Sequence, residues 1–145
     1  AGAPPNDELL QQLKELEINR EQVTFITYPD DRSLARLYEQ ASILLFPSYY
    51  EGFGWPQLEA MAFGCPDVCS DAGALPEVVG DAALTASPEN YKGLASHCRS
   101  ILDDPEKAEK LIALGHQNIQ RFSEEIMAKG LISLYQKAAS AALRK

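Results

Sequence analysis

The chain has 145 residues, of which 46% are hydrophobic, so it is long enough and apolar enough to fold around a real core. Its formal net charge is −8 and its Lys and Arg residues are scattered, which argues against nucleic acid or an anionic lipid surface as a partner. No apolar run approaches membrane-spanning length, so we expect no transmembrane segment, and the first residues do not resemble a signal peptide.

Apolar runs in the first half of the chain predict helices and strands in alternation. The expected elements are a helix capped by Asn6 or Asp7 and running to about Leu16, a strand over Val23–Ile26, a helix starting at Asp31 or Ser33, and a strand over Ser42–Phe46. A further helix is expected from about Pro56 to Phe63, where Gly64 ends it.

The second half continues the same alternation and then turns helical. We expect strands over Asp67–Ser70 and Ala82–Thr85 around a short helix over Leu75–Val79, a helix capped by Ser87 and Pro88 and running to about Leu102, a helix from Asp104 and Pro105 to about Gln120, and a last amphipathic helix from Ser123. Strands that alternate with helices predict an α/β fold, here a Rossmann-like three-layer α/β/α arrangement with a parallel sheet of about four strands. No linker or repeat divides the chain, which predicts a single domain over residues 1–145.

The most informative stretch lies between the second predicted strand and the helix that follows it. Gly52 and Gly54 lie in the loop, and Pro56 occupies the first turn of the helix. The first amides of a helix lack internal acceptors, the helix dipole is positive there, and glycine lets the backbone approach a phosphate. In a parallel sheet this loop falls at the carboxyl ends of the strands, where ligands bind.

Two acidic residues, Glu51 and Glu59, bracket this loop with seven residues between them. An ionised carboxylate only accepts hydrogen bonds and can take two hydroxyl protons at once, which suits the neighbouring hydroxyls of a ribose or a hexose. The pattern therefore favours a sugar nucleotide, with its hydroxyls on the carboxylates and its phosphates on the amides between them. The alternative is an ordinary proline-led helix whose first-turn carboxylate complements the dipole.

The stretch Glu51-Gly-Phe-Gly-Trp-Pro-Gln-Leu-Glu-Ala-Met-Ala-Phe-Gly-Cys-Pro66 resembles the retaining glycosyltransferases of family 4, whose signature is E-G-F-G-x-P-x-x-E-A-M-A-x-G-x-P. The similarity extends to Pro47-Ser48 before the signature and to the segment from Ser70 to Gly80 after it. It implies the C-terminal, donor-binding domain of the GT-B fold, in which two Rossmann-like domains face each other across a cleft. Nearly the whole chain is covered.

The resemblance also implies roles for individual residues. Glu51 is the expected catalytic residue, against the hydroxyls of the transferred sugar, and Glu59 is expected to accept the ribose hydroxyls. The remaining residues implied to bind the substrate, through their amides or by packing on the ribose, are Gly52, Phe53, Gly54, Trp55 and Leu58. The implied reaction transfers a hexose from a nucleoside diphosphate sugar, such as a UDP- or GDP-hexose, with retention at the anomeric carbon. No cofactor and no metal are expected.

The chain departs from the family pattern at three positions. Trp55 replaces a smaller aliphatic residue, Thr27 replaces a glycine, and Asp67 replaces a valine at a buried strand position. An ionised aspartate without a partner is costly to bury, so Asp67 predicts a weakened strand or an altered environment.

Two strands, a helix and an Arg–Lys pair expected before Ala1 are absent, as is the acceptor domain, so the resemblance is to an N-terminally truncated donor domain. We expect the chain alone to be inactive. For its sheet we expect one of three outcomes: a rearranged strand order, association with another copy of the chain through exposed sheet edges, or completion by the missing N-terminal domain.

Other readings remain open from the residues alone. A non-catalytic, truncated or engineered doubly wound scaffold has the same alternation of strands and helices, as does a flavodoxin-like nucleotide-binding protein. Tyr49 and Tyr50 suit either stacking on a ligand or packing at the rim. Three cysteines, Cys65, Cys69 and Cys98, lack metal-ligand spacing and predict reduced, packed thiols in a reducing compartment, which favours the cytoplasm.

Overall fold

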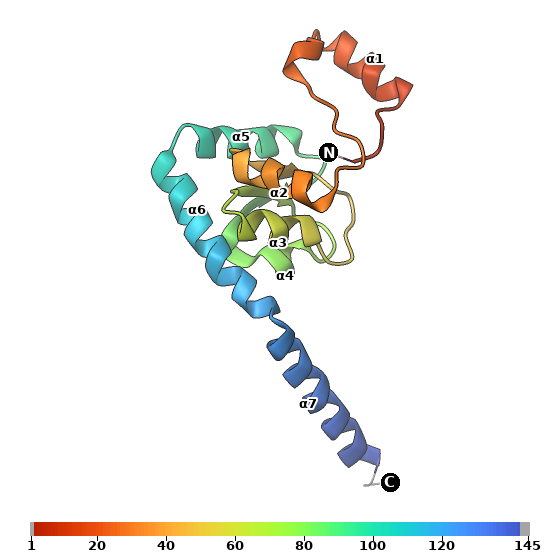
Figure 1. Cartoon of the computed structure of the whole chain (residues 1–145), viewed down its shortest axis with the longest axis vertical. Coiled ribbons are helices and arrows are strands. Elements are labelled where there is room, and N and C mark those ends of the chain that lie inside the picture. Colours follow the sequence, from red (N-terminus) through yellow and green to blue (C-terminus); the bar gives the residue numbers. More distant parts are fainter. Residues whose placement is uncertain (1, 143–145) are drawn as a thin grey trace. The chain divides into compact units, whose positions relative to one another are not determined.

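The computed structural model describes residues 2–142, except for the side chains of Arg20 and Ala142, and it divides into two compact units, Ala1–Leu37 and Tyr38–Lys145 (Figure 1). The first unit contains α1 (Asp7–Glu15), the 3-10 turn η1 (Arg20–Gln22) and the larger part of α2 (Asp31–Gln40). α1 begins as predicted, because the side chain of Asn6 accepts a hydrogen bond from the Leu9 amide at 2.9 Å. α2 begins at Asp31, one of the two predicted starts, and Asp30 caps it by accepting a hydrogen bond from the Ser33 amide at 2.8 Å.

The predicted strand over Val23–Ile26 is wrong. A strand needs a partner backbone along its length, and the described residues provide only an isolated parallel bridge between Gly2 and Thr27. Val23 and Phe25 instead line a hollow together with Leu10 and other residues of α1 and the turn that follows it. The sheet therefore has three strands rather than about four.

The second unit contains this three-stranded parallel sheet, made of β1 (Leu44–Phe46), β2 (Asp67–Ser70) and β3 (Ala83–Ala86) in that spatial order. Leu45 is opposite Val68, and Val68 is opposite Leu84. The spatial order follows the chain, so the described strands show no rearrangement. The α/β class with its parallel sheet is confirmed.

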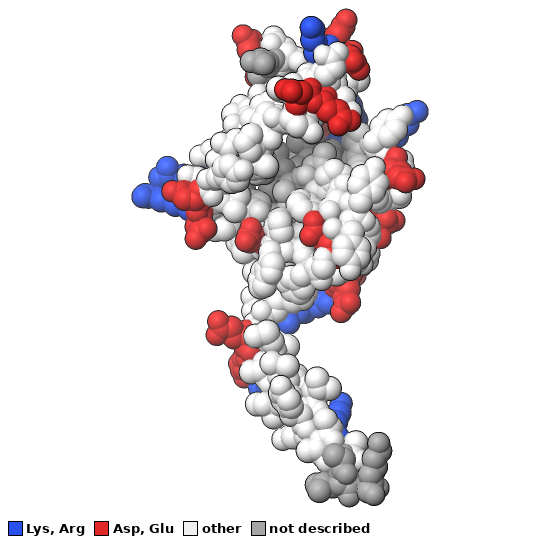
Figure 2. Space-filling view, turned by 90° about the vertical axis from the view of Figure 1, so that its right-hand side faces the viewer, with Lys and Arg blue, Asp and Glu red and all other residues white. Residues whose placement is uncertain are grey.

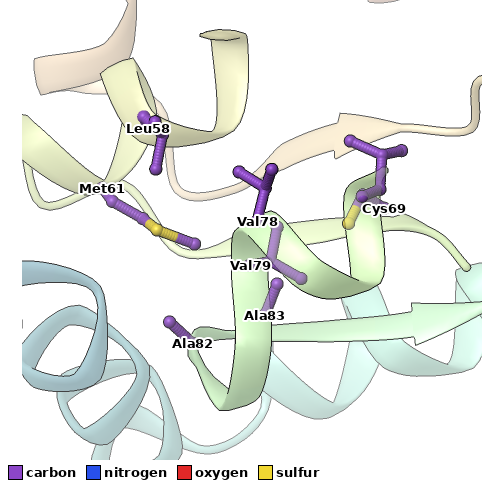
Figure 3. Packing of buried hydrophobic residues seen from close by; sticks show 8 residues of the cluster. Leu58, Met61, Cys69, Val78, Val79, Ala82 and Ala83 are labelled. Carbon is purple, nitrogen blue, oxygen red and sulfur yellow. The ribbon is translucent and has the colours of Figure 1, made fainter. Parts of the chain in front are cut away.

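Helices cover both faces of the sheet, because all four residues of β2 are buried and alternate between the two sides. Cys69 faces a core formed with α3 (Trp55–Ala62) and α4 (Leu75–Val79), in which Leu58 and Met61 lie against Val78 and Val79 (Figure 3). Val68 faces the opposite core, which it shares with Leu94 and Ile101 of α5 (Tyr91–Leu102). The three layers are thus α3 and α4, the sheet, and α5.

The C-terminal helices complete the second unit. After the turn η2 (Gly80–Ala82) and α5, the chain forms α6 (Pro105–Asn118), the turn η3 (Ile119–Phe122) and α7 (Glu124–Ala142). Buried Asn118 donates to the Val78 carbonyl at 2.9 Å, which ties α6 to α4. α5 is capped by Asn90, which accepts from the Gly93 amide at 3.0 Å, rather than by Ser87 and Pro88.

α7 carries its apolar side chains exposed to solvent. It continues beyond η3 (Figure 1), and Leu131, Leu134 and Tyr135 are between 48% and 72% exposed. None of the helices within residues 2–142 combines the length and the apolar character needed to cross a membrane.

Candidate functional site

The loop between β1 and α3 carries the residues that the sequence singled out. β1 ends at Phe46 and α3 begins at Trp55, so the loop lies at the carboxyl end of a parallel strand as predicted. Gly54 is the N-cap of α3, with φ 114° and ψ 54°, and it offers no side chain to cap the helix. Pro56 in the first turn has no N–H group, and no side chain caps the other amide groups at this end, which suit an external acceptor.

The two glycines of the loop have different surroundings. Gly54 is buried, and a Cβ there would lie 2.7 Å from Leu75 Cδ2 and 2.8 Å from Gln57 Oε1. Gly52 is exposed, and a Cβ there would meet nothing within 4 Å. Gly54 is therefore required by its positive φ and by close packing, whereas Gly52 is the glycine whose backbone is open to an approaching ligand.

Glu51 is anchored through both its side chain and its backbone. Ser48 Oγ donates to Glu51 Oε1 at 2.9 Å, and the Glu51 carbonyl accepts from the Ala74 amide at 3.0 Å. The Ser70 hydroxyl in turn donates to the Ser48 carbonyl. The loop after β1 is thereby tied to the end of β2 and to the loop after it, which fixes the start of the Glu51 side chain.

Glu59, on the second turn of α3, is held by a different element. The hydroxyl of Tyr38 donates to Glu59 Oε2 at 3.1 Å, and Tyr38 itself is only 8% exposed. Burial, together with the bond to Glu59, raises the pKa of Tyr38 well above its ordinary value, so the phenol remains protonated and able to donate. One oxygen of Glu59 thus has a fixed partner within the protein.

The aromatic residues of the loop connect it to the core. The ring of Phe53 lies 4.9 Å from that of Trp55 and 5.6 Å, edge to face, from that of Phe122. Phe53 packs against the buried cluster that contains Leu58, whereas Trp55 is 65% exposed. Leu58, which the resemblance placed near a ribose, is a core residue with 7% of its surface exposed.

Two hydroxyl residues of this site, Tyr38 and Ser48, were not predicted to take part in it. Tyr38 lies in the helix that was expected from Asp31 or Ser33, and the signal that could have found it is that a buried phenol usually has a hydrogen-bond partner. The loop carries Glu51, Gly52, Phe53 and Gly54, and Trp55 is the first residue of α3. The carboxylates of Glu51 and Glu59 each accept a hydrogen bond from a different hydroxyl group. Their roles toward a ligand stay predictions.

A buried carboxyl group lies close to the Tyr38–Glu59 pair. Asp67 is fully buried, both its oxygens lack hydrogen-bond partners, and burial raises its pKa to about 7. Burial also raises the pKa of Cys65 to about 11 and that of Cys69 further, so both are poor nucleophiles at neutral pH. All three cysteines are free.

Acidic residues outnumber basic ones in the chain, with 21 Asp and Glu residues against 13 Lys and Arg residues. Figure 2 shows acidic side chains spread over one face of the molecule, with basic ones at its margins. Within residues 2–142, no three His, Cys, Asp or Glu side chains gather in an arrangement that could hold a metal ion. Two hollows of the second unit are lined by residues around Asp81, Leu114 and Arg121, and neither is lined by Glu51 or Glu59.

Comparison with known proteins identifies the family of this chain. Residues 1–118 match the family described as Glycosyl transferases group 1. The chain is 39% identical over 129 residues to O-antigen chain mannosyltransferase B of Escherichia coli, covering 89% of this chain and 34% of that protein. It is 38% identical over 112 residues to the MMP alpha-(1->4)-mannosyltransferase of Mycolicibacterium hassiacum, covering 74% of this chain and 27% of that protein. The chain thus spans about a third of the length of these relatives or less.

Solved structures agree with this family on the fold. Sucrose-phosphate synthase from Thermosynechococcus elongatus is similar with a TM-score of 0.80 and 30% identity, covering 97% of this chain and 38% of that one. The Anabaena protein HepE in complex with UDP-glucose is similar with a TM-score of 0.70 and 25% identity, covering 87% of this chain and 36% of that one. The chain belongs to the glycosyl transferases group 1 family, and its fold is that of a GT-B-like C-terminal domain.

Proposed function

We propose that the chain binds a nucleoside diphosphate sugar around the loop between β1 and α3, and that it is the donor-binding half of a retaining, family 4 glycosyltransferase. The observation that carries the proposal is the placement of Glu51 and Glu59 on either side of a glycine-capped helix N-terminus at the carboxyl end of a parallel strand. Carboxylates accept hydrogen bonds from sugar hydroxyls, and the amide groups at a helix N-terminus donate hydrogen bonds to phosphate oxygens.

Each end of the donor has a residue with suitable chemistry. Glu59 would accept the hydroxyls of the ribose, and Glu51 would accept hydroxyls of the transferred hexose and take the catalytic role. The amides of the loop, Gly52 among them, would face the diphosphate. As the bond to the hexose breaks, negative charge develops on the diphosphate, and fixed amide dipoles stabilise that charge without reorganising. The proposed reaction needs neither a metal nor another cofactor.

The relatives support a hexose as the transferred group. Two of them are mannosyltransferases by name, and HepE was solved with UDP-glucose. A UDP- or GDP-hexose is therefore the proposed donor. The free, high-pKa thiols agree with a reducing compartment, and we propose the cytoplasm.

The proposed enzyme needs a further surface to hold the acceptor. Among the described strands, β1 pairs only with β2, and Leu45 on β1 is 49% exposed. An unpaired strand edge recruits another backbone. We propose that an N-terminal acceptor domain, or another copy of the chain, completes this edge, and that the chain has no transferase activity without it.

Titration of the isotopically labelled chain by NMR tests the proposal. UDP, GDP, ADP, UDP-glucose and GDP-mannose are each added up to millimolar concentration, and the amide signals of Gly52, Gly54 and Glu59 are expected to shift with at least one of them. Glu59→Gln should weaken that response, while the signal of Gly130 on α7 serves as an internal control. No shift with any ligand would instead support a non-catalytic scaffold.

A further inference from the structure

The bond between Tyr38 and Glu59 joins two elements that are separated by the whole loop of the candidate site. Glu59 lies on α3 and is only partly buried, whereas Tyr38 lies at the end of α2 and is 8% exposed. We infer that Tyr38 is a positioning residue, whose hydroxyl holds the Glu59 carboxylate in the orientation that accepts the two hydroxyls of a ribose. This inference rests on the proposed function.

The ring of Tyr38 is itself fixed, which makes its hydroxyl a rigid donor. It stacks on the ring of Phe63, the C-cap residue of α3, at 6.2 Å between centroids and 12° between planes. Burial and the neighbouring acidic groups Glu59 and Asp67 keep the phenol protonated. A protonated phenol donates one hydrogen bond, and the carboxylate of Glu59 is the acceptor that it reaches.

Holding one carboxylate oxygen has a direct consequence for a ligand. A glutamate side chain has three rotatable bonds, and ordering it on binding reduces affinity. With Oε2 bonded to Tyr38, that rotamer freedom is already lost before a ligand arrives, whereas Oε1 and the second lone pair of Oε2 remain available. Two neighbouring ribose hydroxyls need two such acceptor positions. The Tyr38 bond therefore preorganises Glu59 without using up its capacity.

A purely structural bond would have the same geometry, so the test must separate stability from recognition. Tyr38→Phe removes only the hydroxyl and keeps the ring that stacks on Phe63. Tyr91→Phe, on exposed Tyr91 of α5, makes the same chemical change far from Glu59 in the chain and serves as the matched control. Affinities for UDP and for 2′,3′-dideoxy-UDP are measured by calorimetry for each protein, with GDP and its dideoxy analogue as a parallel series.

The expected result is a selective loss. Tyr38→Phe should weaken UDP or GDP binding about tenfold, equivalent to about 1.4 kcal/mol, and leave the dideoxy analogue unchanged. Tyr91→Phe should change neither affinity. Combined with Glu59→Gln, Tyr38→Phe should add little further loss, because the two residues act through one contact.

The outcomes distinguish this inference from the proposed function. If Glu59→Gln weakens binding and Tyr38→Phe does not, the positioning role is wrong and the proposed function stands. If neither nucleotide binds the wild-type chain, or if binding is indifferent to the ribose hydroxyls and to Glu59→Gln, the assignment of Glu59 fails and the role of Tyr38 fails with it.

A second measurement applies if Tyr38→Phe does not fold. The hydroxyl proton of Tyr38 in the wild-type chain should exchange slowly with water and should shift on addition of UDP or GDP. The dideoxy analogue should produce no such shift, and equal responses to both ligands would overturn the inference.

Discussion

Gly73 and Glu51 approach each other so closely that no side chain fits between their backbones. A Cβ on Gly73 would lie 2.5 Å from the Glu51 carbonyl oxygen and 2.9 Å from the Glu51 nitrogen. Next to this contact, the Ala74 amide donates to the same carbonyl at 3.0 Å. The loop after β2 therefore sets the position of the backbone that carries the proposed catalytic glutamate.

Gly73→Ala should destabilise the second unit by about 3 kcal/mol, because a methyl group would collide with backbone and because Gly73 has a φ of +60°. Chemical denaturation followed by circular dichroism measures the change. The control is Gly130→Ala on α7, where a Cβ meets nothing within 4 Å and alanine should stabilise the helix by up to about 1 kcal/mol. Equal stability of the Gly73→Ala variant and the wild type would show that this contact does not constrain the loop.

The local patterns predicted most elements of the second unit because the apolar periodicity and the turn residues of these elements agree with the structure that they form. Strand Asp67–Ser70 and helix Leu75–Val79 have the predicted bounds, and α3 begins one residue before the predicted start. The prediction of a strand over Val23–Ile26 was wrong for a reason that local sequence does not contain. Its residues suit a strand, yet a strand also needs a neighbouring backbone, and a sequence pattern does not show whether one is present.

The candidate site was predicted as a spacing rather than as a set of contacts. The loop, its glycines and both glutamates follow from the order of strand, turn and helix. The partners of the carboxylates do not, because Tyr38 is 21 residues from Glu59 and no local pattern indicates that the two side chains meet. Likewise, Gly54 was predicted to let the backbone approach a phosphate. Only the structure shows that Leu75 occupies the space beside it.

Asp67→Val should stabilise the chain at neutral and alkaline pH and much less in acid. The pKa of Asp67 is raised from 3.8 to about 7 by burial, so the folded state retains a proton that the unfolded state releases. The stabilising contribution of that proton is fully present below about pH 4 and declines as the pH rises to about 7. The difference between these pKa values corresponds to on the order of 4 kcal/mol.

Denaturation of the wild type and of Asp67→Val between pH 4 and pH 8 measures this linkage. The gap in free energy of unfolding between the two proteins should widen as the pH rises. Asp103→Ala, which removes an exposed carboxylate, should show no such widening gap. A constant difference between wild type and Asp67→Val would mean that Asp67 finds a partner or a water molecule in solution.

Gln57→Met should stabilise the second unit by about 1 to 3 kcal/mol, because the amide of Gln57 is fully buried and both its polar atoms lack hydrogen-bond partners. Methionine has a similar length and flexibility, so it can occupy the same space next to Gly54 and Leu75. Thermal unfolding of the two proteins measures the effect. A lower melting temperature for Gln57→Met would indicate that the amide is hydrogen-bonded after all.

Nucleotide binding should strengthen, rather than weaken, when salt is added. The chain has a net charge of −8, and the proposed site holds a diphosphate by amide groups rather than by Lys or Arg side chains. Screening of the overall repulsion between 20 and 200 mM NaCl should lower the Kd for UDP or GDP by about two- to threefold. Binding of the uncharged nucleoside, uridine or guanosine, should be insensitive to salt over the same range. A Kd that rises with salt would instead show that repulsion from the net charge of the chain does not dominate the salt dependence of binding.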